Sequence, residues 1–86
     1  MISKDQARAL ALIVGGGYAA RNGGHQVVRE TPAGTLSAVC HEFSYGSAED
    51  LWEIAFVPAD GGDMLVEGWQ TPGEVVEFFA TQATQA

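Results

Sequence analysis

Lysine and arginine are absent from the last two thirds of this chain. The four basic residues are Lys4, Arg8, Arg21 and Arg29. Residues 30–86 hold ten carboxylates and no Lys or Arg, which gives them a formal charge of −10 with histidine neutral. Residues 1–29 carry +3, because Asp5 offsets one of the four cations. A negative field over most of the chain repels phosphates, so direct binding to nucleic acid is not expected.

Cysteine is nearly absent as well. Cys40 is the only one in the 86 residues, so no disulfide can form within the chain. This excludes a disulfide-stapled secreted mini-protein, and a reducing, cytoplasmic location is the expected one. His25 and His41 are the only imidazoles, so a zinc site built from Cys and His is disfavoured and no metal or cofactor is expected.

A hydrophobic run of membrane-spanning length is also missing. The uncharged segment Ala9–Ala20 has 12 residues, whereas a transmembrane helix needs about 20. Asp5 before it and three consecutive glycines within it argue against a cleaved secretion signal. Neither membrane insertion nor secretion is therefore expected.

The residues that are present are those of a small globular domain. Hydrophobic residues make up 47% of the chain and charged residues 17%, which is enough apolar surface to offset chain entropy. A chain of this length buries only about 60% of the surface that its unfolded form exposes, so its core is small. We expect one domain over residues 1–86.

The first segment predicts a helix over residues 4–22. Ser3 and Gln6 have the spacing of a capping box, and apolar residues then recur at helical spacing. These are Ala7, Leu10, Ala11, Val14 and Tyr18. Asn22-Gly23-Gly24 is a typical left-handed helix stop. The glycines at 15–17 cost roughly 1 kcal/mol each inside a helix, which is tolerable if they pack on another backbone or if the helix breaks there.

Two hairpins are predicted after this helix. The first joins a strand at 25–31 to a strand at 36–45 through the turn Thr31-Pro32-Ala33-Gly34. The second joins 51–57 to 64–70 through a loop at 59–63, since Trp52, Ile54 and Phe56 alternate with their neighbours. A short helix over 49–56 is the competing interpretation, because periodicity does not separate the two in so short a run.

A second helix begins after Thr71. Thr71, Pro72 and Glu74 supply a cap, a favoured first helical residue and the closing residue of a capping box. We expect this helix to end near Thr81 and residues 82–86 to form a frayed tail. The order α-β-β-β-β-α predicts a two-layer α+β domain, in which a four-stranded antiparallel meander is flanked by the N- and C-terminal helices.

Three short motifs invite catalytic or ligand-binding interpretations that their contexts do not support. Residues 15–20 have the G-x-G-x-x-A spacing of dinucleotide-binding turns, but the acidic residue expected about 20 positions later is missing. Cys40 and His41 are neighbours on a predicted strand and point to opposite faces, so they do not form a nucleophile–base pair. Asp60-Gly61-Gly62-Asp63 lacks EF-hand spacing and is typical of a hairpin loop. The chain is not expected to be an enzyme.

The carboxylates gather in the proposed second hairpin and its flanks. Those nearest to it are Glu49, Asp50, Glu53, Asp60, Asp63 and Glu67. A long stretch without counter-charge keeps a coherent field that steers a basic partner. Tryptophan is enriched at protein interfaces. We therefore expect these carboxylates, together with Trp52 and Trp69, to form the partner-binding surface of a small non-catalytic protein.

The expected partner is a basic protein, such as a nuclease, a nucleic-acid-binding complex or a toxin, and the expected action is inhibition. Phage- and plasmid-borne inhibitors of bacterial defence nucleases, including anti-CRISPR and anti-restriction proteins, have this size and acidic character. Immunity proteins and antitoxins that neutralise basic toxins have the same sequence properties. The comparison is one of class, because no motif assigns the chain to a particular family.

Other interpretations of the same residues stay open. An acidic surface also serves solubility alone, and Trp52 and Trp69 also serve as packing residues in the core or on a sheet. The +3 and −10 segments also suit pairing between two copies of the chain, which makes a self-associating homodimer the alternative function. Binding of a small ligand on the exposed face of the sheet is a variant of this alternative.

Overall fold

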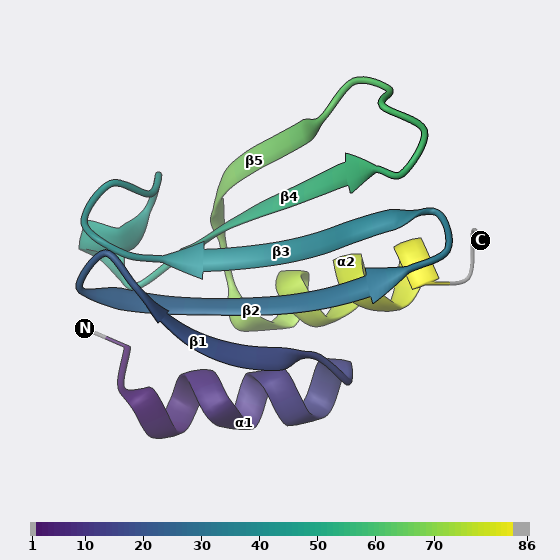
Figure 1. Ribbon diagram of the computed structural model, residues 1–86. Coiled ribbons are helices and arrows are strands. Elements are labelled where there is room, and N and C mark those ends of the chain that lie inside the picture. Colours follow the sequence, from purple (N-terminus) through teal and green to yellow (C-terminus); the bar gives the residue numbers. More distant parts are fainter. Residues whose placement is uncertain (1, 84–86) are drawn as a thin grey trace.

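Two helices and one antiparallel sheet of five strands make up the structure, a computed structural model that describes residues 2–83 (Figure 1). The elements in chain order are α1 (Lys4–Val14), β1 (Gly17–Arg21), β2 (Gly24–Thr31), β3 (Gly34–Cys40), the 3₁₀ turn η1 (Ser47–Glu49), β4 (Trp52–Pro58), β5 (Leu65–Gln70) and α2 (Pro72–Ala83). The predicted α+β class is confirmed. The predicted count of four strands is wrong, because residues 17–21 form a strand of their own.

Helix α1 begins as predicted and ends eight residues early. The backbone N–H of Gln6 donates to Ser3 Oγ (3.1 Å), and that of Ser3 donates to Gln6 Oε1 (2.9 Å), which completes the capping box. Gly15 then takes a left-handed conformation (φ 69°) and caps the helix, donating to the carbonyls of Ala11 and Leu12. The predicted helix over 4–22 is therefore wrong beyond Val14. Of the two alternatives for the glycines, the helix break is the one observed.

Strand β1 turns back into β2 through Asn22 and Gly23. Both have positive φ values (48° and 77°), as in the type I′ turn that matches the twist of a two-residue hairpin. Arg21 pairs with Gly24 on either side of this turn. The segment Asn22-Gly23-Gly24 is thus a hairpin turn rather than the predicted helix stop.

Strands β2, β3 and β4 form the centre of the sheet with the predicted hairpin between β2 and β3. Strand β3 ends at Cys40, so the predicted strand over 36–45 is too long. Residues 41–51, called the connector below, form turns that Ser44 stabilises: its hydroxyl accepts from the N–H of His41 (3.0 Å) and donates to the carbonyl of His41 (2.9 Å). Over 52–58 the strand interpretation is correct, and the only helical turn nearby is η1.

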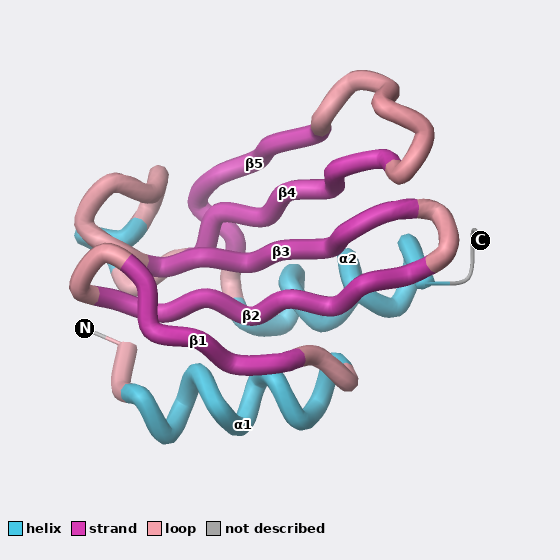
Figure 2. The backbone as a smooth tube through the Cα atoms, in the orientation of Figure 1, coloured by secondary structure: helices cyan, strands magenta, loops and turns pink. Residues whose placement is uncertain are grey.

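The core lies between the two helices and one face of the sheet. Helix α1 packs on β1 and β2, and helix α2 packs on β3, β4 and β5 (Figures 1 and 2). The buried side chains are Ala7, Leu10, Ala11, Val14, Val27, Leu36, Ala38, Cys40, Trp52, Ile54, Val75 and Phe79. The alternate strand residues point away from the helices, and the side that they form is called the open face below.

Helix α2 begins with the second predicted capping box. The N–H of Glu74 donates to Thr71 Oγ1 (3.2 Å), and the N–H of Thr71 donates to Glu74 Oε1 (2.9 Å). The helix continues to Ala83, so residues 82 and 83 belong to it and not to the predicted tail, while residues 84–86 lie outside the described part of the chain. Among the described residues, no helix is both long enough and apolar enough to cross a membrane.

Candidate functional site

The fold converts the charge separation of the sequence into a separation in space. The strands lie in the sheet in chain order, β1-β2-β3-β4-β5, so residues distant in the chain are also distant across the sheet. The four basic residues lie on α1, β1 and β2, together with Asp5 and Glu30. Every other carboxylate lies on the connector, β4, β5, the loop between them or α2. These elements are called the acidic half below.

Within the acidic half, the predicted site carboxylates do not form one patch. Glu49 and Asp50 precede the first residue of β4, whereas Asp60 and Asp63 lie in the loop after its last residue, at the opposite end of the strand (Figure 1). All four are exposed. The proposed cluster is thus spread along the whole length of β4.

The two remaining predicted carboxylates lie on opposite faces of the sheet. Glu67 pairs with Ile54, a core residue, so it lies on the helix-covered side of β5, where it is exposed at the sheet edge. Glu53 follows the buried Trp52 on β4 and therefore points to the open face, where it is partly exposed. Of the six predicted carboxylates, Glu53 alone lines the shallow hollow of the open face described below.

The two tryptophans occupy opposite environments, so they do not form the expected joint surface. Trp52 is 1% exposed and belongs to the core, which corrects its prediction as a partner contact. Trp69 is 56% exposed. The pairing of β4 with β5 shifts between Trp52 and Ile54: two steps along β4 match three along β5, from Gln70 to Glu67. Because of this bulge, the side chain of Trp69 does not follow the regular alternation of side chains between the two faces of the sheet.

Trp69 stacks on Tyr45 of the connector. Their ring centroids are 5.4 Å apart and the ring planes are inclined by 24°. Tyr45 is 62% exposed, so both rings present most of their surface to solvent. The side chain of Glu53 is bonded to the backbone of Tyr45: its Oε2 accepts a hydrogen bond from the N–H of Tyr45 at 2.8 Å. We call Tyr45, Glu53 and Trp69 the aromatic–carboxylate site.

The backbone at this site is strained. Trp69 has φ +55°, in the left-handed region that costs a residue with a side chain roughly 1–2 kcal/mol. Its N–H donates to the carbonyl of Tyr45 (3.3 Å), which ties the bulge to the connector. Gly46 and Gly68 allow the two segments this close: a Cβ on Gly46 would lie 2.9 Å from the Cα of Trp69, and one on Gly68 would overlap the Cβ of Tyr45.

The open face beside this site forms a shallow hollow of about 330 Å³. Its lining includes residues of β1 to β4 together with Met64 and Val66. Toward β1 and β2 the lining is polar, with Arg21 bonded to Gln26 (3.3 Å) and Gln26 bonded to Ser37 (3.2 Å). Toward β4 and β5 it is apolar, with Ala55, Val57, Met64 and Val66. The apolar part belongs to the acidic half.

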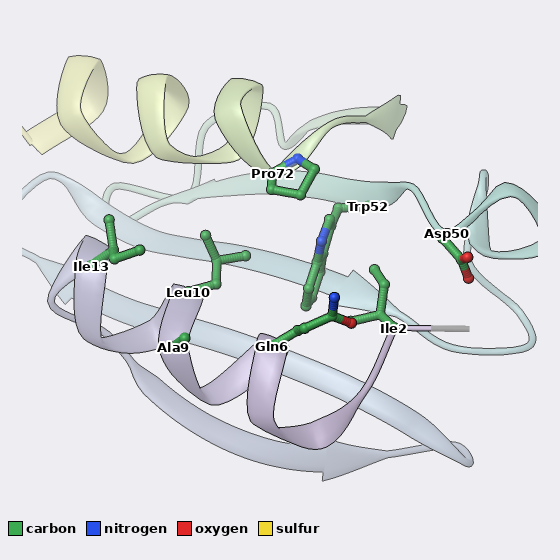
Figure 3. A pocket seen from close by; sticks show the side chains of 8 residues that line it. All are labelled: Ile2, Gln6, Ala9, Leu10, Ile13, Asp50, Trp52 and Pro72. Carbon is green, nitrogen blue, oxygen red and sulfur yellow. The ribbon is translucent and has the colours of Figure 1, made fainter.

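A second pocket, of about 440 Å³, opens between the start of α2 and helix α1 (Figure 3). The Trp52 indole points from β4 toward helix α1, beside Leu10 and Gln6, and lines the pocket (Figure 3). Ile13 at its rim is 68% exposed. Among the described residues, Asp50 is the only charged one in the lining, so these residues offer apolar contact but no arrangement of groups for chemistry.

Cys40 lacks the environment of a reactive thiol. It is buried, and this burial raises the pKa of the thiol above its ordinary value of 9.0; the nearby negative charge of Asp50 raises it further. A nucleophilic cysteine needs a lowered pKa, which favours the thiolate. His25 and His41 line a pocket of about 350 Å³ together with Cys40, but both ring nitrogens of His25 and Nδ1 of His41 are engaged with other groups.

The contacts of the two imidazoles are structural. His25 Nδ1 is 2.7 Å from the Tyr18 hydroxyl, and its Nε2 donates to the carbonyl of Ile2 at 3.0 Å. His41 Nδ1 accepts from the N–H of Phe43 at 3.1 Å. Each ring therefore anchors a neighbouring backbone segment. Neither of them is bonded to Cys40 in a nucleophile–base arrangement.

The described residues contain no group of three or more His, Cys, Asp or Glu side chains placed to hold a metal ion. Asp60 of the predicted hairpin loop accepts from the N–H of Gly62 through Oδ1 (2.8 Å), a turn contact. Residues 15–20, with the dinucleotide-like glycine spacing, run from a helix into a strand, which is the reverse of the strand-to-helix order that such sites require.

No protein-family model matches the chain, and no curated protein or solved structure is significantly similar to it. The candidate site is therefore defined by geometry and charge.

The connector residues of the site are not among the residues that the sequence predicts for it. The predicted strand over 36–45 includes Tyr45, although Gly46 directly after it and Ser44 before it are turn formers. The isolated Gly68 beside Trp69 was the available signal for a bulge, because a glycine inside a strand pattern often marks one. The contact between Tyr45 and Trp69 is set by the path of the connector, for which a single sequence gives no local pattern.

Proposed function

We propose that this chain is a non-catalytic binding protein that docks its acidic half on a basic protein surface and inhibits that partner. The observation that carries this proposal is the spatial separation of charge. Partners with the required surface are nucleases, nucleic-acid-binding complexes and toxins. The inhibitor would thus be of the anti-defence type, such as an anti-CRISPR or anti-restriction protein, or of the immunity or antitoxin type.

Two features support a binding role over mere solubility. Solubility is served by interspersed charges, whereas the acidic half contains no Lys or Arg. A coherent field of this kind accelerates association with a basic surface and disfavours partners of like charge. The acidic half also presents exposed large apolar side chains, which are Phe43, Tyr45, Val57, Met64, Leu65, Val66 and Trp69. Apolar surface surrounded by charge is typical of protein interfaces.

The absence of a catalytic role is part of the proposal. Catalysis by a side-chain nucleophile needs that group, a base and an orienting group within hydrogen-bond reach. Cys40 is buried with a raised pKa, and both histidines are engaged in structural bonds. These contacts support a binding protein rather than an enzyme.

The test is capture of partners from the native host with the full-length chain as bait, at low and at high salt, followed by mass spectrometry. A basic partner should be recovered, and its affinity should fall steeply as salt rises. Glu67→Lys and Glu30→Lys form a matched pair: each changes the net charge by two at an exposed strand residue. Only Glu67 lies in the acidic half, so only Glu67→Lys should weaken binding strongly.

Equal binding by wild type and Glu67→Lys, or a captured partner with an acidic surface, would refute the proposal. Enzymatic turnover by the chain that is lost in Cys40→Ser or His41→Ala would refute its non-catalytic part.

Self-association is the second candidate, and the two sheet edges favour it. Strands β1 and β5 each pair with only one neighbour. Arg21 lies on β1 and Glu67 on β5, so the edges carry opposite charges. The bulge in β5 opposes edge-to-edge pairing, because irregular edges disfavour strand addition. Sedimentation across a salt series decides: association that weakens with salt supports this candidate, and a monomer under all conditions removes it.

A further inference from the structure

The aromatic–carboxylate site has the composition of a receptor for a planar cation. We propose that Tyr45, Glu53 and Trp69 bind an arginine side chain of the partner protein. The inference rests on the proposed function, which supplies a basic partner, and adds to it the contacting group and its position on the acidic half.

The two aromatic rings supply the stacking surface. A guanidinium is attracted to the face of an aromatic ring, and most strongly to that of tryptophan. The rings of Tyr45 and Trp69 already stack on each other and are 62% and 56% exposed. Each ring has few rotatable bonds, so its ordering on binding costs little entropy. An arginine laid over this pair therefore gains contact area without a rearrangement of the site.

Glu53 supplies the opposite charge. Its carboxylate is fixed beside the pair by the hydrogen bond from the N–H of Tyr45, and carboxylates pair with the planar fork of a guanidinium better than with an ammonium group. Residues 30–86 hold no Lys or Arg that would compete for it. His41 lines the same hollow as Glu53, and its Nδ1 accepts from the N–H of Phe43. Arg21, which lines the same hollow as Glu53, is bonded to Gln26. Charge therefore favours a cation from the partner.

The strain at Trp69 points to the same role. A left-handed tryptophan is costly, and most of its indole is in solvent, so burial does little to offset that cost. Strained residues that persist in a fold often serve a function. The Trp69–Tyr45 backbone bond and the Ser44 bonds fix both segments before any partner arrives. A preformed site of this kind binds more tightly than a flexible one.

The experiment is an NMR titration of the ¹⁵N-labelled full-length chain with a hexa-arginine peptide and, separately, with hexa-lysine. The two indole N–H signals give an internal control, because Trp52 is buried and Trp69 is exposed. Trp69→Gly removes the indole and suits the positive φ, so the fold is retained. Trp69→Phe restores an aromatic face. Leu12→Ser is the surface control, since Leu12 is 84% exposed on α1.

Hexa-arginine should shift the Trp69 indole signal and the amides of Tyr45 and Glu53, and leave the Trp52 indole unchanged. Hexa-arginine should bind more tightly than hexa-lysine by about threefold or more, and Trp69→Gly should weaken it by about fivefold or more. Trp69→Phe should recover part of the loss, and Leu12→Ser should bind as the wild type does.

The variant Asp60→Asn/Asp63→Asn separates this inference from the proposed function. If it weakens peptide binding while Trp69→Gly does not, the arginine site is refuted but the acidic half still binds cations. Equal affinity for the two peptides also refutes the site, because plain charge attraction then accounts for the binding. No binding of hexa-arginine at low salt refutes the site, and capture of a basic host partner still tests the proposed function independently.

Discussion

The Tyr45 ring lies 5.4 Å from the Trp69 indole, centroid to centroid. The connector and β5 lie so close together here that Gly68 has no space for a side chain. A Cβ at Gly68 would overlap the Cβ of Tyr45. The stacked pair on the acidic half therefore depends on a glycine that carries no functional group.

Replacement of this glycine should destabilise the protein. Gly68→Ala forces the connector away from β5, and we expect a loss of about 1–3 kcal/mol in the free energy of unfolding, typical of overpacking. Gly73→Ala is the control, since the nearest atom to an added Cβ there is 3.9 Å away and alanine suits the first turn of α2. Urea unfolding followed by circular dichroism gives both values; equal stabilities of the two variants would contradict the packing argument.

The left-handed conformation at position 69 predicts an unusual ranking of substitutions. Trp69→Gly relieves about 1–2 kcal/mol of backbone strain and loses about 0.5–1.5 kcal/mol of ring stacking, so its unfolding free energy should stay within about 1 kcal/mol of the wild type. Trp69→Val keeps the strain and loses the stacking, so it should be the least stable. Unfolding can be followed through the buried Trp52. A valine variant as stable as the glycine variant would show that the strain is absent.

The turn between β1 and β2 can be tested at Asn22, which has φ 48°. Asn22→Gly should be tolerated, because glycine adopts positive φ without cost. Asn22→Val should cost about 1–2 kcal/mol, because a β-branched side chain disfavours this conformation. Amide hydrogen exchange localises the effect: protection should fall first in β1, the edge strand whose backbone pairs with β2 alone in the sheet. Uniform loss of protection over the sheet would contradict a local role.

The buried thiol of Cys40 predicts a decline in stability at alkaline pH. Burial and the charge of Asp50 raise the folded-state pKa above the ordinary 9.0 of the unfolded chain. The unfolded chain therefore loses this proton first, so the contribution of Cys40 to stability is complete below pH 9 and is lost as the pH rises through the folded-state pKa. The difference in unfolding free energy between wild type and Cys40→Ala should be constant below pH 9. It should shrink as the pH rises from 9 through the folded-state pKa of the thiol.

Thiol labelling provides an independent check of the same property. Cys40 should react slowly with a disulfide reagent in the native protein and quickly in urea, because the buried thiol has little thiolate to offer. Rapid native-state labelling at neutral pH would contradict the raised pKa and would reopen cysteine chemistry for this chain.

The elements predicted most accurately are those specified by neighbouring residues. Both capping boxes form from residues three positions apart, Ser3 with Gln6 and Thr71 with Glu74. The hairpin of β2 and β3 follows from its own turn, and the buried positions of α1 follow from their helical spacing. Local hydrogen bonds and side-chain periodicity are sufficient in these cases.

The largest difference between the predicted and the observed fold is the helix over 4–22, and it depends on a segment that two local interpretations fit. Asn22-Gly23 is both a helix stop and a strong hairpin signal. The choice between them depends on β2, which offers β1 a full set of backbone partners from Gly17 to Arg21. A helix over the same residues would forgo these bonds and would carry three glycines in its interior.

The sequence by itself determined the α+β class, the helix starts and the separation of positive from negative charge, because each depends on residue type and order along the chain. Only the tertiary structure decided which acidic and aromatic side chains meet. The meander spreads the predicted carboxylates from one end of β4 to the other, whereas a bulge at Gly68 and the path of the connector bring Tyr45, Glu53 and Trp69 together. Contacts across 24 positions of sequence depend on backbone packing, which no local pattern encodes.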